Sequence, residues 1–311
     1  MKRIFVFTLA LIWLICTGCA AEEDMPQKSP SPPIVSSLPL PDAEKPAVST
    51  EPAPESTPTP TPTLLGEPSD SFLVNLKEYI PDAAVALRYA TEDNFTGKII
   101  YDFSEAYLRY GTVKKLAAVQ EELETMGLGL KVWDAFRPVS AQYVLWETCP
   151  NPVYVANPNT GFSSHSRGNT LDVTLVSSEG DELIMPTAFD DFSSLADRNY
   201  SDCSPEAAEN ALLLQNVMEK HGFSGYFGEW WHFSDNQSYE VERVFDPAVI
   251  AIRRPKCEEF ISLRSGADTS ASVLTTIPVG GSFTLLGYTG EFSYVEYLGL
   301  RGYVLTSYTM E

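Results

Sequence analysis

The sequence predicts an α+β domain with a mainly antiparallel sheet flanked by helices, followed by a small all-β barrel. Between residues 70 and 250, helical and strand-like patterns alternate without the regular rhythm of a parallel α/β protein. From residue 257 to 311, short strand-like runs are separated by turns that contain glycine. A chain of 311 residues is long enough for two such domains.

The first 19 residues have the pattern of an export signal. Lys2 and Arg3 precede an apolar run from Ile4 to Ile15 that is too short to span a bilayer comfortably. The small residues just before Cys19 resemble a bacterial lipobox. This resemblance implies a signal peptide, acylation of Cys19 and an extracytoplasmic protein that is lipid-anchored to the cell membrane and faces the cell wall. Plain secretion is the alternative.

Residues 20–69 are rich in proline, serine and threonine, and they include the run TPTPTP. Such a composition cannot bury enough apolar surface to fold, so we expect a disordered tether. At roughly 3.1 Å per residue in an extended chain, the tether could hold the folded part on the order of 100 Å from the membrane.

Composition also excludes several classes of protein. A formal charge of −21 disfavours a nucleic-acid partner, because the chain would repel phosphate groups. If Cys16 is cleaved off and Cys19 is acylated, three cysteines remain: Cys149, Cys203 and Cys257. An odd number excludes a fully paired framework, and we interpret each as a buried small hydrophobe. A single bridge between Cys149 and Cys203 stays open.

The first domain begins with a helix followed by a strand. Residues 113–126 predict a helix that ends at Gly127, and residues 128–136 predict a strand that ends before a proline. The expected buried face of the helix consists of Val113, Leu116, Ala117, Leu123 and Met126.

A second strand and a second helix follow. Residues 170–176 alternate, which places Asp172 on the side away from an apolar face. Ser204 and Pro205 form a helix start, and Gly222 is a suitable stop. His221, beside that stop, is interpreted as a charge at the helix C-terminus.

The last part of the chain changes character after an expected linker at residues 253–255. Residues 283–288 and 292–297 are strand-like runs between glycine turns. LRSG at 263–266 and GYV at 302–304 resemble the motifs of a bacterial SH3 domain. The resemblance implies binding to peptidoglycan, and a structural β-appendage without a ligand is the alternative.

Two of the three histidines lie in unusual surroundings: SSHSRGNTLD at residues 163–172 and EWWH at residues 229–232. Histidine and carboxylate groups from separate segments suit a catalytic zinc, which keeps a fourth position for water. Taken alone, however, polar residues satisfied by hydrogen bonds explain the two segments equally well.

In combination, the two segments resemble the SxHxxGxAxD and ExxH signatures of the VanX-type D-alanyl-D-alanine dipeptidases, a family of zinc D,D-peptidases. Three further segments resemble motifs of the same family in the same order: RYATEDNFTGK at 88–98, WDAFRP at 133–138 and MPTAFD at 185–190. Together they cover nearly all of residues 72–235. Thr170 replaces the usual alanine and removes no ligand.

The resemblance implies one Zn²⁺ per chain, with Glu229 as the catalytic acid/base. The implied metal ligands are His165, Asp172 and His232. Zinc makes hydroxide available near neutral pH, and Glu229 would take its proton and deliver it to the departing amine. Arg137 would meet the negative charge that develops on the carbonyl oxygen. A purely structural ion pair with Asp134 is the alternative for this arginine.

The same resemblance implies a site for the free ammonium of a dipeptide. Asp190 is the expected charge partner, with Ser163 and Tyr89 assisting, and the adjacent Asp191 is the alternative acid. The function expected is hydrolysis of D-alanyl-D-alanine at the cell envelope. Two alternatives remain open: a D,D-carboxypeptidase or endopeptidase acting on peptidoglycan stem peptides, and a non-catalytic protein that binds the cell wall.

Overall fold

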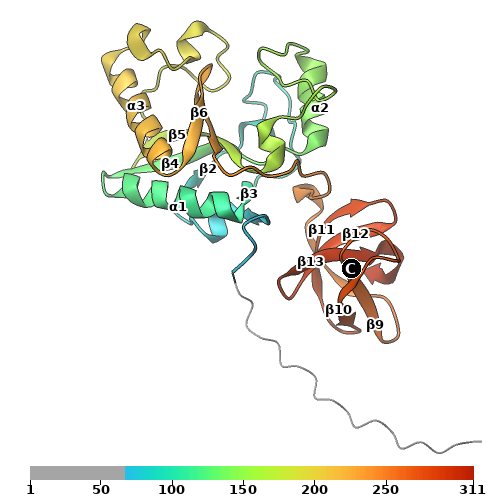
Figure 1. Ribbon diagram of the computed structural model, residues 1–311. Helices are drawn as coiled ribbons and strands as arrows, with labels where there is room; N and C mark the ends of the chain where they lie inside the picture. Colours follow the sequence, from blue (N-terminus) through green and yellow to red (C-terminus); the bar gives the residue numbers. More distant parts are fainter. Residues whose placement is uncertain (1–66) are drawn as a thin grey trace, which may run out of the picture. The chain divides into compact units, whose positions relative to one another are not determined.

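The computed structural model describes residues 67–311 (Figure 1). The expected signal peptide, the expected acylation site at Cys19 and all but the last residues of the expected tether therefore lie outside the described residues. Within the described part, none of the helices is both long enough and apolar enough to cross a membrane.

A five-stranded sheet forms the centre of the first domain and confirms the α+β prediction. Its strand order is β2-β4-β5-β7-β6, and every neighbouring pair except β2 and β4 is antiparallel (Figure 1). The strands are β2 (Ala84–Val85), β4 (Leu128–Asp134), β5 (Thr170–Ser177), β7 (Glu229–Asp235) and β6 (Phe223–Tyr226). Beside it, β1 (Leu73–Asn75) pairs with β3 (Tyr107–Arg109).

The first helix, α1 (Tyr110–Glu124), begins three residues earlier than predicted. Gly127 has a φ of 70°, as expected for a left-handed stop. Met126, however, is 47% exposed, so its prediction as a core residue was wrong. The reason is that the helix ends at Glu124, which leaves Met126 in the turn beyond it.

The remaining helices are α2 (Val139–Thr148) and α3 (Pro205–Lys220). The predicted start of α3 is confirmed, because the Ser204 hydroxyl accepts a hydrogen bond from the Ala207 amide at 3.2 Å. At its other end, Nε2 of His221 lies 2.6 Å from Oε2 of Glu122 in α1. His221 therefore joins the ends of two helices.

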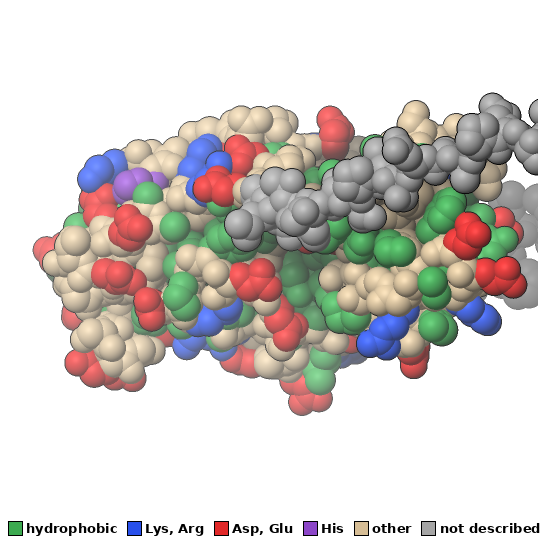
Figure 2. Space-filling model, turned by 90° about the horizontal axis from the view of Figure 1, so that it is seen from below, with side chains coloured by type: hydrophobic (Ala, Val, Ile, Leu, Met, Phe, Trp, Pro, Cys, Tyr) green, Lys and Arg blue, Asp and Glu red, His purple; other side chains and the backbone are tan. Residues whose placement is uncertain are grey.

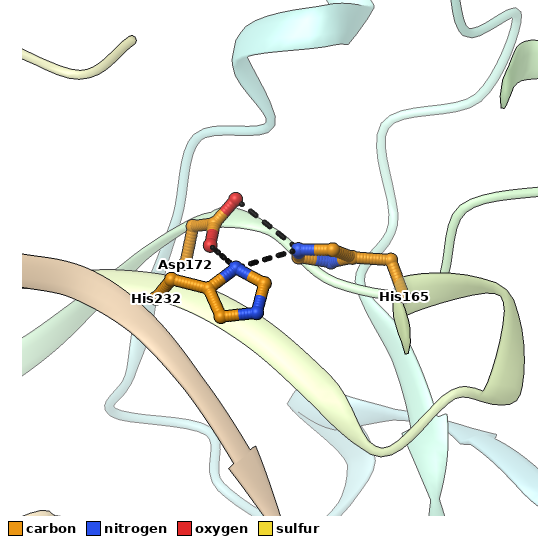
Figure 3. A group of neighbouring side chains, drawn as sticks. All are labelled: His165, Asp172 and His232. Carbon is orange, nitrogen blue, oxygen red and sulfur yellow. Dashed lines mark hydrogen bonds and ion pairs between the residues drawn. The ribbon is translucent and has the colours of Figure 1, made fainter. Parts of the chain in front are cut away.

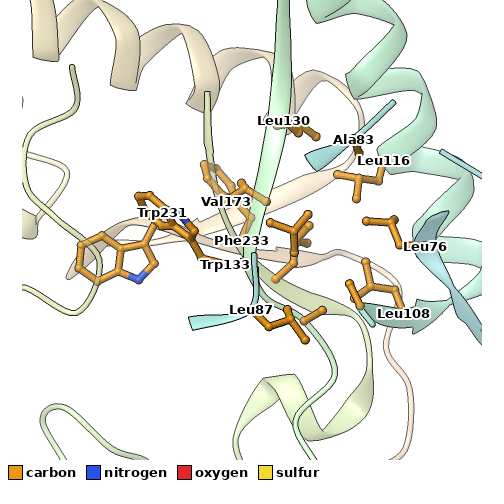
Figure 4. Close-up of a cluster of buried hydrophobic side chains, with 14 of the residues drawn as sticks. Leu76, Ala83, Leu87, Leu108, Leu116, Leu130, Trp133, Val173, Trp231 and Phe233 are labelled. Carbon is orange, nitrogen blue, oxygen red and sulfur yellow. The ribbon is translucent and has the colours of Figure 1, made fainter. Parts of the chain in front are cut away.

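Large apolar side chains from β4, β5, β7 and α1 form the core of this domain (Figure 4). The central strand β5 is buried on both faces, because Thr170, Asp172 and Thr174 are as buried as the apolar residues between them. The polar face predicted for this strand therefore points into the protein, where a polar side chain needs a partner.

The last part of the chain is antiparallel and all-β, as predicted, and has its own apolar core. Its strand order is β10-β9-β13-β12-β11-β8-β14. The strands are β8 (Ala251–Pro255), β9 (Phe260–Arg264), β10 (Val273–Pro278), β11 (Phe283–Thr289), β12 (Phe292–Tyr297), β13 (Leu300–Leu305) and β14 (Thr309–Met310). The linker expected at residues 253–255 is instead part of β8, because backbone pairing with β11 and β14 does not require apolar side chains.

The three cysteines of the described part are free thiols, so Cys149 and Cys203 form no bridge. All three are half-buried, whereas we expected them to be fully buried. Cys149 packs against the first core and Cys257 against the second. The Cys203 thiol donates a hydrogen bond to the Tyr200 carbonyl at 3.2 Å.

The surface agrees with the acidic composition. Figure 2 shows Asp and Glu side chains spread over one face, with hydrophobic side chains between them. Lys and Arg side chains are also visible on that face, in smaller groups among the acidic ones.

Candidate active site and metal centre

The sheet places two aspartate side chains and one histidine side chain in a row across three of its strands. Asp134 at the end of β4 is opposite Asp172 on β5, and Asp172 is opposite His232 on β7. Residues directly opposite each other in an antiparallel pair point to the same face and lie close together. The row exists because the pairing of β4 with β5 and of β5 with β7 aligns these three residues.

His165 reaches this row from a short 3₁₀ helix, Ser164–Arg167, which lies just before β5. The Ser163 hydroxyl caps this helix by accepting a hydrogen bond from the His165 amide at 3.3 Å. Gly168 ends it with a φ of 74°, a conformation that glycine adopts without strain. The histidine is therefore held by a turn that is capped at both ends.

The three expected metal ligands converge on one point (Figure 3). Nε2 of His165 lies 3.4 Å from Oδ2 of Asp172 and 3.3 Å from Nδ1 of His232, and the latter atom is 3.0 Å from Oδ1 of Asp172. Ligand atoms about 2.1 Å from a tetrahedral ion lie about 3.4 Å from each other. The spacing therefore fits a single metal ion.

The orientation of the donor atoms supports the same conclusion. Nδ1 of His165 donates to the Ala135 carbonyl at 2.9 Å, which leaves Nε2 with a lone pair toward the other two residues. Oδ1 of Asp172 is buried and accepts no hydrogen bond of good geometry among the described residues, although Nδ1 of His232 lies 3.0 Å away. Burial alone would raise the pKa of Asp172, but His165 and His232 hold it well below its usual range. An ionised carboxylate with a free lone pair has the chemistry that a metal ligand needs.

Glu229 is the first residue of β7, three residues before His232. Its Oε2 lies 3.5 Å from Nδ1 of His232, so the carboxylate adjoins the donor cluster. Burial raises the pKa of Glu229. A carboxyl group with a raised pKa beside a metal site suits proton transfer near neutral pH.

Arg137 is both an ion-pair partner and a pocket residue. Its Nη2 and Nε donate to Oδ2 of Asp134 at 2.6 and 3.2 Å, and its Nη1 donates to Oε1 of Gln142 at 2.9 Å. The structural alternative for this arginine is therefore present in the molecule. Arg137 also lines the same pocket as the metal ligands, so the pair with Asp134 does not remove it from the site.

A cavity of about 260 Å³ opens beside the three ligands. Its polar lining beyond those ligands includes Tyr89, Ser163 and Asp190. The Tyr89 hydroxyl donates to Oδ2 of Asp190 at 2.9 Å, and burial raises the pKa of Asp190 well above its ordinary value. Asp191 instead accepts a hydrogen bond from the Ser193 amide outside this cavity. The structure therefore brings Asp190 to the site, and Ser163 serves the turn that holds His165.

Sequence reasoning missed several residues of the site. Tyr154 and Phe192 stack with ring centroids 4.4 Å apart on the cavity wall, and Tyr226 lines the same cavity. Tyr154 and Phe192 belong to irregular segments without periodicity, and Tyr226 is the last residue of the short strand β6, so no local pattern indicates that the three line one cavity. Arg198 also belongs to this group, because its Nη2 donates a hydrogen bond to the backbone carbonyl of His232 at 2.9 Å. Trp230 and Trp231 are fully buried, and the Trp230 indole donates to the Thr187 hydroxyl.

The chain is similar to known proteins over both parts. Residues 70–250 match the peptidase M15 family model, described as D-Ala-D-Ala dipeptidase, and residues 259–310 match that of the bacterial SH3 domain. The D-alanyl-D-alanine dipeptidase of Escherichia coli is 39% identical over 56% of this chain and 90% of its own length. The D-alanyl-D-alanine dipeptidase of Enterococcus faecium is 32% identical over 47% of this chain and 82% of its own length.

Another relative with the same name, from Streptomyces coelicolor, is 31% identical over 51% of this chain and 89% of its own length. Among solved structures, the LdcB LD-carboxypeptidase aligns with 55% of this chain and 69% of its own, at 20% identity. The TM-score of 0.32 is too low for the two sites to be compared.

Proposed function

The chain belongs to the peptidase M15 family of D-Ala-D-Ala dipeptidases, which are metallopeptidases, and on that premise we propose that it hydrolyses D-alanyl-D-alanine to two D-alanines with zinc. The observation that carries the proposal is the pairing of a three-ligand donor set with a buried acid in one small cavity. The donor set supports hydrolysis, and the acid supports recognition of a free ammonium.

A zinc ion held by His165, Asp172 and His232 would polarise the peptide carbonyl and lower the pKa of a water molecule. Glu229 lies beside this position and accepts the proton of the attacking water, then passes it to the departing amine. Arg137 faces the cavity with a permanent charge and stabilises the oxygen that becomes negative.

Asp190 supplies the recognition of the substrate. Its carboxyl group and the Tyr89 hydroxyl form a polar pair on the wall of the cavity that also holds the three expected metal ligands. A buried carboxyl group with a raised pKa gains most from an ammonium group, which restores a partner for its charge. A dipeptide carries that ammonium, whereas the N-terminal side of a peptide bond in a wall stem peptide does not.

The test compares hydrolysis of D-alanyl-D-alanine with that of its N-acetyl derivative by the zinc-loaded protein. We expect turnover of the free dipeptide and little of the acetylated one. Asp190→Asn should raise KM for the dipeptide about 10-fold or more, because a charge-assisted contact is lost. Asp191→Asn is the matched control and should behave as wild type. Rapid hydrolysis of the acetylated peptide would support a carboxypeptidase or endopeptidase instead.

A second test separates catalysis from binding of the cell wall. Glu229→Gln keeps the size of the side chain but cannot accept the proton, so we expect kcat to fall about 10²- to 10⁴-fold. Zinc content should stay at one ion per chain. Unchanged hydrolysis in this variant would remove Glu229 from the mechanism, and inactivity of the wild type on every peptide would support a role in binding alone.

We also propose that the protein is exported, lipid-anchored through Cys19 and bound to peptidoglycan by the SH3-like part. The basic start, the apolar run and the small residues before Cys19 support export and acylation. Cys19→Ala should release the protein from the membrane fraction of a bacterial host, whereas the control Cys16→Ala should not. The full chain carrying Glu229→Gln should sediment with peptidoglycan sacculi, and a protein that stays in the supernatant would contradict wall binding.

A further inference from the structure

Arg198 lies between the two last strands of the first sheet and helix α3. Its guanidinium stacks on the ring of Phe233, with Cζ 4.4 Å from the ring centroid. Within residues 67–311, no carboxylate lies within ion-pair distance of Arg198, and burial lowers its pKa although Glu219 and Glu229 act on it from farther away. A cation in this position without an anionic partner requires another explanation.

The donors of Arg198 are directed at backbone carbonyls of the β6–β7 hairpin. Nε donates to the Tyr226 carbonyl and Nη2 to the His232 carbonyl, both at 2.9 Å. The backbone amide of Arg198 donates to the Phe227 carbonyl, also at 2.9 Å. On the opposite side, Nη1 reaches Oε1 of Gln215 in α3 at 3.2 Å. One residue therefore joins both strands of the hairpin to the neighbouring helix.

A register shift in the sheet explains why the His232 carbonyl is available. Gly225 on β6 is opposite Phe233 on β7, but the next residue, Tyr226, is opposite Glu229. Residues 230–232 of β7 therefore have no partner in β6. A buried carbonyl that loses its partner in the ladder must find another donor. Arg198 supplies that donor to His232.

Gly225 leaves the space that the guanidinium occupies. A Cβ atom at this position would lie 2.2 Å from Cζ of Arg198 and 2.4 Å from its Nη2. The backbone of Gly225 does not have a positive φ, so its conformation does not require glycine. The close approach of the Arg198 guanidinium explains why this position holds a glycine.

We propose that Arg198 is a positioning residue that replaces the missing part of the β6–β7 ladder and thereby fixes Glu229 and His232. The same short strand carries the expected acid/base and one metal ligand, three residues apart. A shift of this strand moves both groups relative to His165 and Asp172, which are held by other elements. Displacements of about 1 Å can cost about 100-fold in rate, and loss of a supporting contact to a metal ligand costs about 10- to 100-fold in affinity or activity.

The experiment measures zinc affinity and steady-state kinetics of the full chain. Arg198→Met should weaken zinc binding about 10-fold, as measured by competition with a chromophoric chelator. It should lower kcat for D-alanyl-D-alanine about 10- to 100-fold with less than about a 3-fold change in KM. Arg198→Lys should recover part of both losses, because one ammonium can reach one of the two carbonyls.

A matched control separates positioning from general stability. Val119→Ala removes buried methyl groups from α1, far from the hairpin in sequence and outside the cavity lining. It should lower Tm while leaving zinc affinity and kcat unchanged. Equal losses in Val119→Ala and Arg198→Met, or wild-type values in Arg198→Met, would overturn the proposal.

A double-mutant cycle tests the link to Gly225. Gly225→Ala alone should lower zinc affinity and kcat like Arg198→Met, because its Cβ displaces the guanidinium. In the Arg198→Met background the same change should add less than about 2-fold, and additive effects would overturn the link. The kinetic readout rests on the proposed function, but the zinc readout does not. If the wild type fails to hydrolyse the dipeptide, the proposed function fails while zinc affinity still decides the role of Arg198.

Discussion

Asp134→Asn is the most informative perturbation of the site, because it separates the two roles of Arg137. Oδ1 of Asp134 accepts from the Tyr101 hydroxyl at 2.8 Å and from the Ala135 amide at 2.9 Å. Oδ2 accepts both bonds from Arg137. An asparagine that keeps its oxygen at the first position places an amide donor against two guanidinium donors. The substitution therefore removes the two bonds to Arg137 and the negative charge that lies 3.6 Å from Nδ1 of His165.

The expected loss is large because both partners are buried. Asp134 is fully buried and Arg137 nearly so. Leaving one member of a buried ion pair without its partner costs about 3 to 5 kcal/mol. Relief of the repulsion between Asp134 and the opposite Asp172 offsets part of this, so we expect about 3 kcal/mol. For a domain of this size, that lowers Tm by roughly 6 to 12 °C.

The assay is thermal unfolding of the zinc-loaded protein, with kcat measured below the transition. Asp134→Asn should lower Tm by roughly 6 to 12 °C. It should also lower kcat, because Arg137 loses the partner that orients it. In an Arg137→Met background the same change should raise Tm instead of lowering it, because it removes a buried carboxylate that has lost its cation. A Tm within about 2 °C of wild type, or an equal drop in both backgrounds, would refute the reasoning.

Three further outcomes follow from the structure. Removal of the metal by a chelator should abolish hydrolysis, and zinc at about 100 times its dissociation constant should restore it and add about 2.7 kcal/mol of stability. Because burial raises the pKa of Asp190, its ionisation destabilises the fold above the ordinary carboxyl pKa, so Asp190→Asn should raise Tm at about pH 8 and not at about pH 4. Gly168→Ala should lower Tm by several degrees, about 1 to 3 kcal/mol, because its Cβ would lie 2.4 Å from Cδ2 of the buried Leu73.

The sequence predicts the groups that act through local pattern. The alternation of residues 170–176 placed Asp172 on the correct side of β5, and the helix signals at Ser204 and Gly222 located α3. The family motifs indicated the three residues that converge on one metal position, and that convergence is observed. These features were predictable because each depends on neighbours in the chain.

Contacts between distant segments were not predictable in the same way. Arg198 lies in an irregular loop, and its partners are backbone carbonyls, which no side-chain pattern reveals. The position of Met126 depended on where α1 ends, and the pairing of β8 depended on strands that follow it in the sequence. In each of these cases, tertiary packing or backbone pairing decided the result, and local composition did not.

The site depends on two irregularities of the same sheet, one on each side of the strand that carries Asp172. On one side, a register shift between Val132 and Asp134 precedes the row that joins β4 to β5. On the other, the shift between β6 and β7 opens the ladder beside His232. Two carboxylates opposite each other are unfavourable unless cations flank them. Arg137 neutralises Asp134, so Asp172 is the carboxylate left for a metal ion. We therefore attribute the metal position to the arrangement of charges across the sheet as well as to its three ligands.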